Sequence, residues 1–135
     1  MTPEEIYTRG QDLCEAMMAG DVDGVMSRMS QNVMYSDYGV SALDMDFTAV
    51  KTFMAGMFKA CENMQLKTRS HNGTQEFSVW EWDLECDFAE NGQHFGFKKG
   101  AHVKMAGCSL QWWNKEGKLY KNHDYASFVR ENPES

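Results

Sequence analysis

Hydrophobic and polar positions alternate with a helical period in the first part of the chain. Thr2 can cap a helix, Pro3 favours its first turn, and Glu5 completes a capping box. The apolar residues that follow recur at helical spacing, namely Ile6, Leu13, Cys14, Met17 and Met18. This pattern predicts a first helix of about four turns.

Two further helices are predicted before residue 65. Gly20 ends the first helix, and Asp21 can cap a short second helix whose apolar face is formed by Val22, Val25, Met26 and Met29. The stretch NVMYSDYGV, residues 32–40, is a strand candidate. Asp46 can then cap a third helix with one apolar stripe, which consists of Val50, Phe53, Met54, Met57, Phe58 and Cys61.

From Gln65 onward the pattern is typical of a sheet. Asn72-Gly73 and Asn91-Gly92 are hairpin signals, and Glu116-Gly117 between two apolar runs is a third turn. Four antiparallel strands are therefore predicted, at roughly residues 65–71, 76–89, 94–112 and 118–128. Helices followed by a long sheet indicate the α+β class, and the length predicts one domain over residues 1–135.

The stretch WEWDLECDF, residues 80–88, has the clearest strand period. Its apolar residues alternate with four acids, Glu81, Asp83, Glu85 and Asp87. In one interpretation the apolar face meets the helices and the acids are solvated. In the other interpretation, a strongly curved sheet buries its outer face in a dimer, and the acidic face lines a pocket. The carboxylates there would raise one another's pKa. The pattern leaves both interpretations open.

Composition and charge narrow the class of partner. The 135 residues are 42% hydrophobic and 24% charged, which is typical of a soluble globular protein. A net charge of −7 and a pI near 5.0 disfavour nucleic acid as a partner, because its phosphates require a basic surface. The stretch MTPEEIYTRG lacks the features of a signal peptide, and no apolar run approaches the roughly 20 residues that span a bilayer. We therefore expect a cytoplasmic protein with no membrane partner.

Cysteine and histidine spacing gives no sign of a metal site. Cys14, Cys61, Cys86 and Cys108 are widely spaced and form no C-x-x-C pair, which favours reduced and mostly buried thiols over disulfides or zinc ligands. The histidines at positions 71, 94 and 102 lack metal-ligand spacing with one another or with cysteine. We expect neither a metal nor a cofactor.

The order of the elements resembles the nuclear transport factor two-like superfamily over nearly the whole chain. This superfamily includes SnoaL-like polyketide cyclases, ketosteroid isomerases, scytalone dehydratase and limonene epoxide hydrolases. The local resemblance lies in MMAGDVDGVMSRMSQNVMYSDYGV, residues 17–40, and in MAGCSLQWWNKEGKLYKNHDYASF, residues 105–128. The resemblance implies a cone-shaped fold, with three N-terminal helices packed on a curved, mainly antiparallel sheet. The superfamily contains both enzymes and non-enzymes, so the function depends on the pocket.

The resemblance implies a general base at Asp37. Ketosteroid isomerases hold their catalytic aspartate in the first strand after an Ala-Gly-Asp junction, and Asp37 follows Asp21 at the matching spacing. Leu13 and Ser109 occupy the positions at which those isomerases carry an oxyanion-binding tyrosine and a protonated aspartic acid. Steroid isomerisation is therefore disfavoured. The turn chemistry of Ser36-Asp37-Tyr38-Gly39 also allows Asp37 to be a simple turn residue.

Asp124 is the second candidate. The segment His123-Asp124-Tyr125 resembles the Arg-Asp-Tyr segment of the epoxide hydrolases, and SnoaL-like cyclases carry an acid at the same place. The arginine and aspartate that the hydrolases need on an earlier strand are replaced by Glu81 and Asp83, so the hydrolase triad is incomplete. His123 is a second choice for the acid, because adjacent strand residues face opposite sides of a sheet.

These residues predict cofactor-free acid and base catalysis. A carboxylate in an apolar pocket has a raised pKa and can take a proton from a carbon acid. We predict a small-molecule isomerase, cyclase or dehydratase that acts on an apolar carbonyl compound, polyketide-like or terpenoid-like, with Asp37 and Asp124 as acid and base. The residues expected to contact the substrate are Tyr35, Met54, Phe58, Ser109 and Tyr120. Eleven methionines and eight phenylalanines are consistent with a deformable cavity and equally with ordinary core packing.

The alternative function is a non-catalytic ligand-binding or dimerisation module. In that case apolar side chains fill the cone, and Asp37 and Asp124 are exposed to solvent. Relatives in the superfamily commonly dimerise through the sheet. Trp112 and Trp113 are adjacent and must face both sides of a strand, which gives a reason to expect a homodimer here as well.

Overall fold

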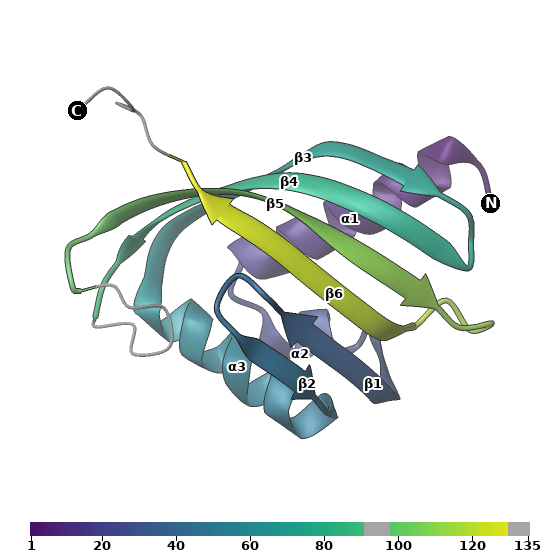
Figure 1. The fold of residues 1–135 in the computed structure, drawn as a ribbon, viewed down its shortest axis with the longest axis horizontal. Coiled ribbons are helices and arrows are strands. Elements are labelled where there is room, and N and C mark those ends of the chain that lie inside the picture. The colour runs from purple at the N-terminus through teal and green to yellow at the C-terminus, as the bar shows by residue number, and fades with distance from the viewer. Residues whose placement is uncertain (91–97, 130–135) are drawn as a thin grey trace.

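The computed structural model describes residues 1–90 and 98–129, which form three helices and six strands (Figure 1). The helices are α1 (Pro3–Met18), α2 (Val22–Met26) and α3 (Phe47–Ala60). The strands are β1 (Met29–Asp37), β2 (Ala42–Met45), β3 (Cys61–Gly73), β4 (Phe77–Phe88), β5 (His102–Trp113) and β6 (Leu119–Phe128). The α+β class predicted from the sequence is therefore confirmed.

Each helix begins at its predicted cap. The side chain of Thr2 accepts a hydrogen bond from the Glu5 backbone N–H at 3.2 Å. Asp21 accepts from Gly24 and Asp46 accepts from Ala49, both at 2.9 Å. These bonds satisfy backbone donors that the first turn of a helix leaves without an intrahelical partner.

The six strands form one sheet in the order β2-β1-β6-β5-β4-β3. Neighbouring strands are antiparallel except for β1 and β6, which run parallel. The parallel pairing places Asp37 directly beside Asp124, as partners in the register. The first and last strands of the chain are thereby brought together at the middle of the sheet.

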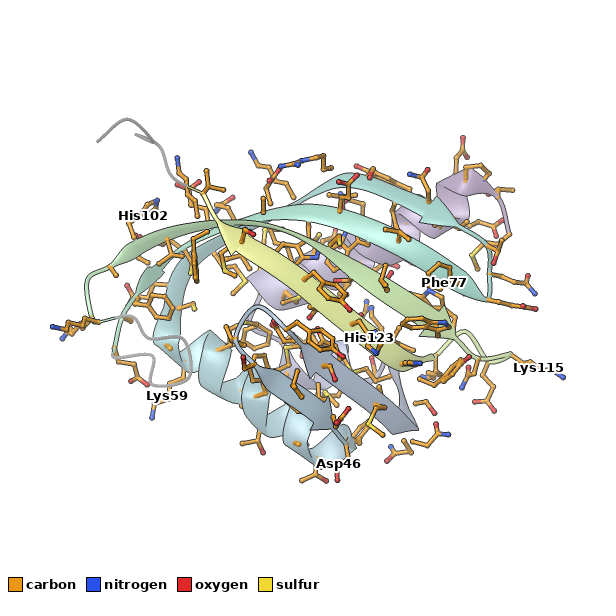
Figure 2. All side chains as sticks on the ribbon, viewed as in Figure 1. Asp46, Lys59, Phe77, His102, Lys115 and His123 are labelled. Atoms are coloured by element: carbon orange, nitrogen blue, oxygen red, sulfur yellow. The ribbon has the colours of Figure 1, made fainter. Side chains whose placement is uncertain are left out.

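The sheet arches over the helices, and its concave face packs against α1 and α3 (Figure 1). Side chains fill the space between the sheet and these helices (Figure 2). Trp80 and Trp82 are buried against α1 in a cluster with Cys14 and Leu66. Glu81 and Asp83, which alternate with the tryptophans, form polar contacts on the opposite, exposed face. The first interpretation of the WEWDLECDF strand is therefore correct.

Several predicted boundaries differ from the structure. Strand β2 was not predicted, because it is short and is entered through Ser41, whose φ of 57° is unusual for a residue other than glycine. Strand β3 begins at residue 61 rather than 65, directly after α3, and bulges let it bend. Residues 98–101 were predicted as strand and instead lie before β5. The Asn91-Gly92 turn lies outside the described residues.

The turn between β3 and β4 follows Gly73, whereas the sequence predicted it at Asn72-Gly73. Gly73 is still paired with Ser78, and the turn is closed by Thr74, whose N–H donates to the Phe77 carbonyl at 2.7 Å. The φ of Gly73 is 146°, and a side chain at this position would begin only 2.2 Å from that carbonyl. Glycine is required here for close approach of two backbones rather than as the second residue of a tight turn.

Two other sequence-based expectations can be compared with the structure. Cys14 and Cys86 are buried, whereas Cys61 and Cys108 are partly exposed, so the cysteines are less uniformly buried than predicted. Among the described residues, no helix combines the length and apolar character needed to cross a membrane.

Candidate functional site

An apolar cavity of about 100 Å³ lies between the concave face of the sheet and the helices. Methionine supplies much of its wall, at positions 17, 29, 54, 57, 64 and 105. Trp80, Trp82 and Trp113 supply aromatic surface. Polar groups reach the cavity from three adjacent strands, namely Tyr35 and Asp37 of β1, Asn122 and Asp124 of β6, and Ser109 of β5. An apolar cavity with a few convergent polar groups is typical of a small-molecule site.

Asp124 is at the centre of these polar groups. Its side chain accepts hydrogen bonds from the Tyr35 hydroxyl at 2.6 Å, the Ser109 hydroxyl at 2.6 Å and the Asn122 amide at 2.7 Å. The Trp82 indole N–H donates in turn to the Ser109 oxygen at 3.0 Å. Three donors hold the Asp124 carboxylate in one orientation inside the cavity.

The strand geometry explains why these donors meet. Asn122 and Asp124 are two residues apart and therefore face the same side of β6. Ser109 is the partner of Asp124 across the β5–β6 ladder. Tyr35 lies two residues before Asp37, so both face the cavity from β1.

Burial raises the pKa of Asp124, which is only 6% exposed, and its three hydrogen-bond donors partly oppose that rise. Burial raises the pKa of the Tyr35 phenol as well, and the neighbouring Asp124 charge adds to the effect. Tyr35 therefore keeps its proton and acts as a donor to Asp124.

Asp37 is the group whose proton can be exchanged near neutral pH. Burial, followed by the charge of Asp124, raises the pKa of Asp37 to about 7, although a backbone bond from Gly39 at 2.9 Å acts in the opposite direction. Neighbouring carboxyl groups in an apolar site do not ionise independently. The pair can therefore hold one proton at neutral pH, with Asp124 as the carboxylate and Asp37 as the carboxylic acid.

The remaining predicted residues fall into two groups. Met54 lines the cavity, as do Tyr35 and Ser109, which bind Asp124. Phe58 packs against the core beside the cavity, and Tyr120 is 37% exposed; neither is among the described residues that line it.

His123 faces away from Asp124. Its ring packs on the outer face of the sheet against Tyr38 and Trp112, with ring centroids 5.5 and 5.0 Å apart. This position follows from the alternation of side chains along β6. This position keeps His123 out of the cavity, although its charge is near enough to oppose the rise in the pKa of Asp124. The acids at the positions of the incomplete hydrolase triad, Glu81 and Asp83, also lie outside the cavity.

Sequence reasoning missed several groups of the site, among them Asn122, Trp82, Arg9 and Arg28. Asn122 could have been found, because it precedes Asp124 by two residues on the same strand. Arg9 precedes Leu13 by one helical turn and could have been assigned to the same face of α1. Trp82 and Arg28 depend on contacts that only the folded sheet creates.

Comparison with known proteins gives a consistent assignment. No protein-family profile matches the chain. The cyclase aurE from Calcarisporium arbuscula is 36% identical over 108 residues, which cover 80% of this chain and 76% of aurE.

Solved structures give the same fold at low sequence identity. AclR from Streptomyces galilaeus, a candidate hydroxylase, superposes with a TM-score of 0.77 at 13% identity and covers 93% of this chain and 91% of its own. A SnoaL-like polyketide cyclase candidate from Shewanella denitrificans has a TM-score of 0.75 at 11% identity, with 91% and 90% covered. The 36% identity over most of both chains shows that this chain belongs to the same family as the cyclase aurE, and its fold is that of the SnoaL-like proteins.

Proposed function

We propose that this protein is a cofactor-free cyclase or isomerase that acts on an apolar carbonyl compound by general acid and base catalysis. The observation that carries the proposal is the pairing of Asp37 and Asp124 side by side at the wall of an apolar cavity. One carboxyl group is fixed by three donors, and the other has a pKa of about 7. An ionised base beside an acid that still holds its proton is what proton transfer to and from carbon requires.

In the proposed reaction the Asp124 carboxylate removes a proton from the carbon next to a substrate carbonyl. Asp37 gives its proton to the carbonyl oxygen, so that an enol forms and no charge accumulates on it. The enol carbon then either attacks a second carbonyl of the same molecule, whose oxygen takes the proton from Asp124 as the new C–C bond closes a ring, or the conjugated enol takes that proton at another carbon, which completes an isomerisation. In both cases the enol O–H returns its proton to Asp37, so both carboxyl groups recover their starting states. Tyr35, Ser109 and Asn122 act as positioning residues, since they hold Asp124 toward the cavity.

The wall of the cavity supports an apolar, polyketide-like substrate. Methionine side chains adapt to irregular shapes, and the tryptophans offer flat surfaces for conjugated or ring-forming chains. An apolar wall also excludes water, which would otherwise compete for the enol and the acid. Ring closure is favoured over isomerisation because aurE is named a cyclase.

Proton exchange at carbon tests the proposal without knowledge of the natural substrate. We expect the protein to accelerate exchange of the central C–H protons of 1-phenylbutane-1,3-dione in D₂O, followed by proton NMR. The Asp124→Asn variant should lower the catalysed rate about 10²–10⁴-fold. The matched variant Asp83→Asn, on the outer face, should leave it unchanged. Binding of the diketone with no catalysed exchange in the wild type would favour the non-catalytic ligand-binding module instead.

We also propose that the protein forms a homodimer through the outer face of the sheet. Aromatic rings lie in contact across this face: Tyr38, Tyr125, His123, Trp112 and Phe77. Such a patch on an otherwise charged surface is typical of an interface. Light scattering at micromolar concentration should give the mass of a dimer, and Trp112→Ser should lower it toward that of a monomer. A monomeric wild type would contradict this proposal.

A further inference from the structure

One end of the cavity carries a cation that the proposed reaction does not use. Arg9, Leu13 and Met17 lie one turn apart on α1 and all line the cavity. The Arg9 guanidinium lies 4.2 Å from the centre of the Trp113 ring, and its Nη1 donates to the Gln75 carbonyl at 3.3 Å. Trp113 ends β5 and Gln75 lies in the β3–β4 turn, so Arg9 marks the end of the cavity where these segments meet.

Arg9 has no carboxylate partner among the described residues. The cations that form ion pairs with described acids include Lys51, Arg69, His102 and Lys104, but not Arg9. A guanidinium has five N–H donors in a planar fork that fits a carboxylate. The bond to Gln75 uses one of them, which leaves donors for a ligand in the cavity.

A second arginine lies at the same end. Arg28 lines the cavity, and its side chain donates to the Gly24 carbonyl and forms no ion pair with a described acid. The Arg28 carbonyl accepts from the Leu119 N–H at 2.9 Å, directly after the β5–β6 turn. Gly117 of that turn lies close to the Arg9 guanidinium. Both arginines therefore border the β5–β6 turn.

This end is well separated from the carboxyl pair. Trp113 follows Ser109 by four residues on β5, and Ser109 is the partner of Asp124. At a rise of about 3.4 Å per residue, Trp113, which contacts the Arg9 guanidinium, lies roughly 14 Å along β5 from the partner of Asp124. An anion near Arg9 would therefore avoid repulsion from the two acids while its apolar body reached them.

We propose that Arg9 and Arg28 bind the carboxylate end of an elongated apolar substrate whose reacting carbon lies beside Asp37 and Asp124. The position of the reacting carbon rests on the proposed function, whereas binding of the carboxylate does not. The arginines would fix how far the chain enters the cavity, and so would select which carbon meets the acids.

Binding of dodecanoate and 1-dodecanol tests this without turnover. Both probes have the same chain length, and tryptophan fluorescence can follow both because three tryptophans line the cavity. At pH 8 and low salt, the wild type should bind dodecanoate at least tenfold more tightly than dodecanol. Arg9→Gln should abolish that preference and leave dodecanol affinity within about twofold. The control Arg69→Gln, which removes an exposed arginine paired with Asp83, should change neither affinity.

The outcomes separate this inference from the proposed function. Equal affinities of the wild type for the two probes, or an unchanged preference in Arg9→Gln, would overturn the arginine site. The wild-type comparison decides the question even if Arg9→Gln does not fold. Asp124→Asn should retain the preference for dodecanoate. If it does so, and if it also retains proton exchange, the catalytic proposal fails while the arginine site stands.

Discussion

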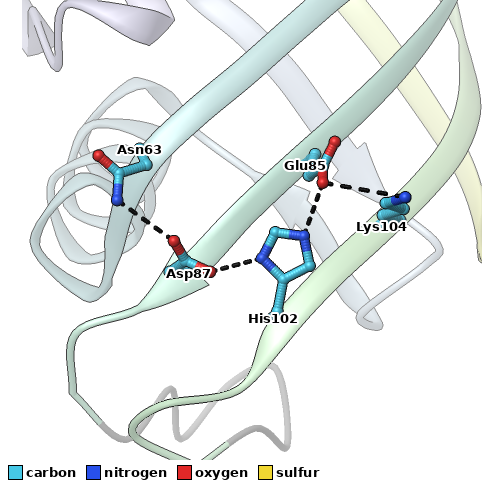
Figure 3. Close-up of polar contacts among 5 residues, drawn as sticks. All are labelled: Asn63, Glu85, Asp87, His102 and Lys104. Carbon is cyan, nitrogen blue, oxygen red and sulfur yellow. Dashed lines mark hydrogen bonds and ion pairs between the residues drawn. The ribbon is translucent and has the colours of Figure 1, made fainter.

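Two sets of carboxyl groups on one sheet have opposite properties. Asp37 and Asp124 face the cavity, where burial raises the pKa of both. The outer face carries a row of acids that are exposed and paired with cations or polar groups. In Figure 3, His102 lies between Asp87 and Glu85, with nitrogen-to-oxygen distances of 2.5 and 2.6 Å. The bond from His102 lowers the pKa of Asp87.

The comparison shows that position on the sheet, rather than residue type, decides the chemistry of an acid. The inner pair has hydroxyl, phenol and amide donors, and among the described residues neither acid forms an ion pair with a cation. Its charge is therefore disfavoured and a proton is retained. The outer acids have water and cations, which favour the charged form.

Replacement of the acid of the inner pair should have a larger effect than any change on the outer face. The Asp37→Asn variant should lower the catalysed exchange rate about a hundredfold at pH 6, because an amide cannot donate the proton to the carbonyl oxygen. The wild-type rate should fall as pH rises through about 7, where Asp37 loses its proton. The rate of Asp37→Asn should be flat between pH 6 and 8, and the exchange assay measures both. A rate that rises through pH 7 in the wild type would contradict the assignment of Asp37 as the acid.

The raised pKa of Asp37 should also make the stability of the fold depend on pH, with stability falling as pH rises. A carboxyl whose pKa is about 7 when folded and near 3.8 when unfolded binds its proton more tightly in the folded state. It stabilises the fold below the unfolded pKa, and this contribution is lost as pH rises from about 4 to 7. The loss is on the order of 4 kcal/mol. Urea unfolding across this range should show the decline in the wild type and a flatter profile in Asp37→Asn, and equal profiles would show that Asp37 is solvated.

Two helix glycines, one facing the sheet and one facing open space, allow the same contrast between inner and outer positions to be tested for packing. Gly10 lies against the sheet, where an added Cβ would lie 2.8 Å from His71 Nδ1 and 3.1 Å from Trp80 Nε1. Gly56 of α3 has open space at the same position. Gly10→Ala should lower the free energy of unfolding by about 1–3 kcal/mol. Gly56→Ala should raise it by about 0.5–1 kcal/mol. Thermal or urea unfolding measures both, and a stabilising Gly10→Ala would show that the contact can relax.

The close approach of Gly10 also explains why one nitrogen of the buried His71 ring has no hydrogen-bond partner. His71 is 6% exposed, and its Nε2 lies 2.9 Å from Gln111 Oε1 and 3.0 Å from the Ser78 hydroxyl. Its Nδ1 has no hydrogen-bond partner among the described residues and faces Gly10. Burial accordingly lowers the pKa of His71. The space beside α1 therefore holds the neutral ring of His71, and a side chain at position 10 would collide with it.

Local signals predicted the parts of this fold that depend on neighbours in the sequence. The caps at Thr2, Asp21 and Asp46, and the alternation in the WEWDLECDF strand, each involve residues within one turn or one strand. The short strand β2 was missed because its pairing with β1 is tertiary and its residues carry no period. The start of β3 was missed because Cys61 continues the apolar stripe of α3.

The site was only partly accessible to sequence reasoning for the same reason. Asp37 and Asp124 were found through a resemblance, yet their contact comes from parallel pairing of strands 87 residues apart. The Tyr35 hydroxyl bond to Asp124 also crosses that pairing. Which side of the sheet was hollow could not be read from the alternation, because both faces of WEWDLECDF satisfy the same period. The helices that cover one face settle it.

The smallest effect is expected on the outer face. Hydrogen bonds to Asp87 and Glu85 raise the pKa of His102. The ion pairs stabilise the fold while His102 is charged, and the contribution fades as pH rises through that raised pKa. Because the groups are exposed and screened by solvent, no change in the urea midpoint is expected from Asp87→Asn. Its effect should appear only in the NMR titration of His102.

In that titration, Asp87→Asn should move the pKa of His102 toward 6.5, and added salt should move the wild-type value in the same direction. The control is Glu81→Gln, an outer acid that accepts a hydrogen bond from Ser70 instead of from His102. Glu81→Gln should leave the pKa of His102 unchanged. A His102 pKa that is the same in the wild type and in Asp87→Asn would mean that solvent alone sets the charge of the outer face. The inner and outer acids would then differ in pKa because of burial alone, and not because cations lie beside the outer acids.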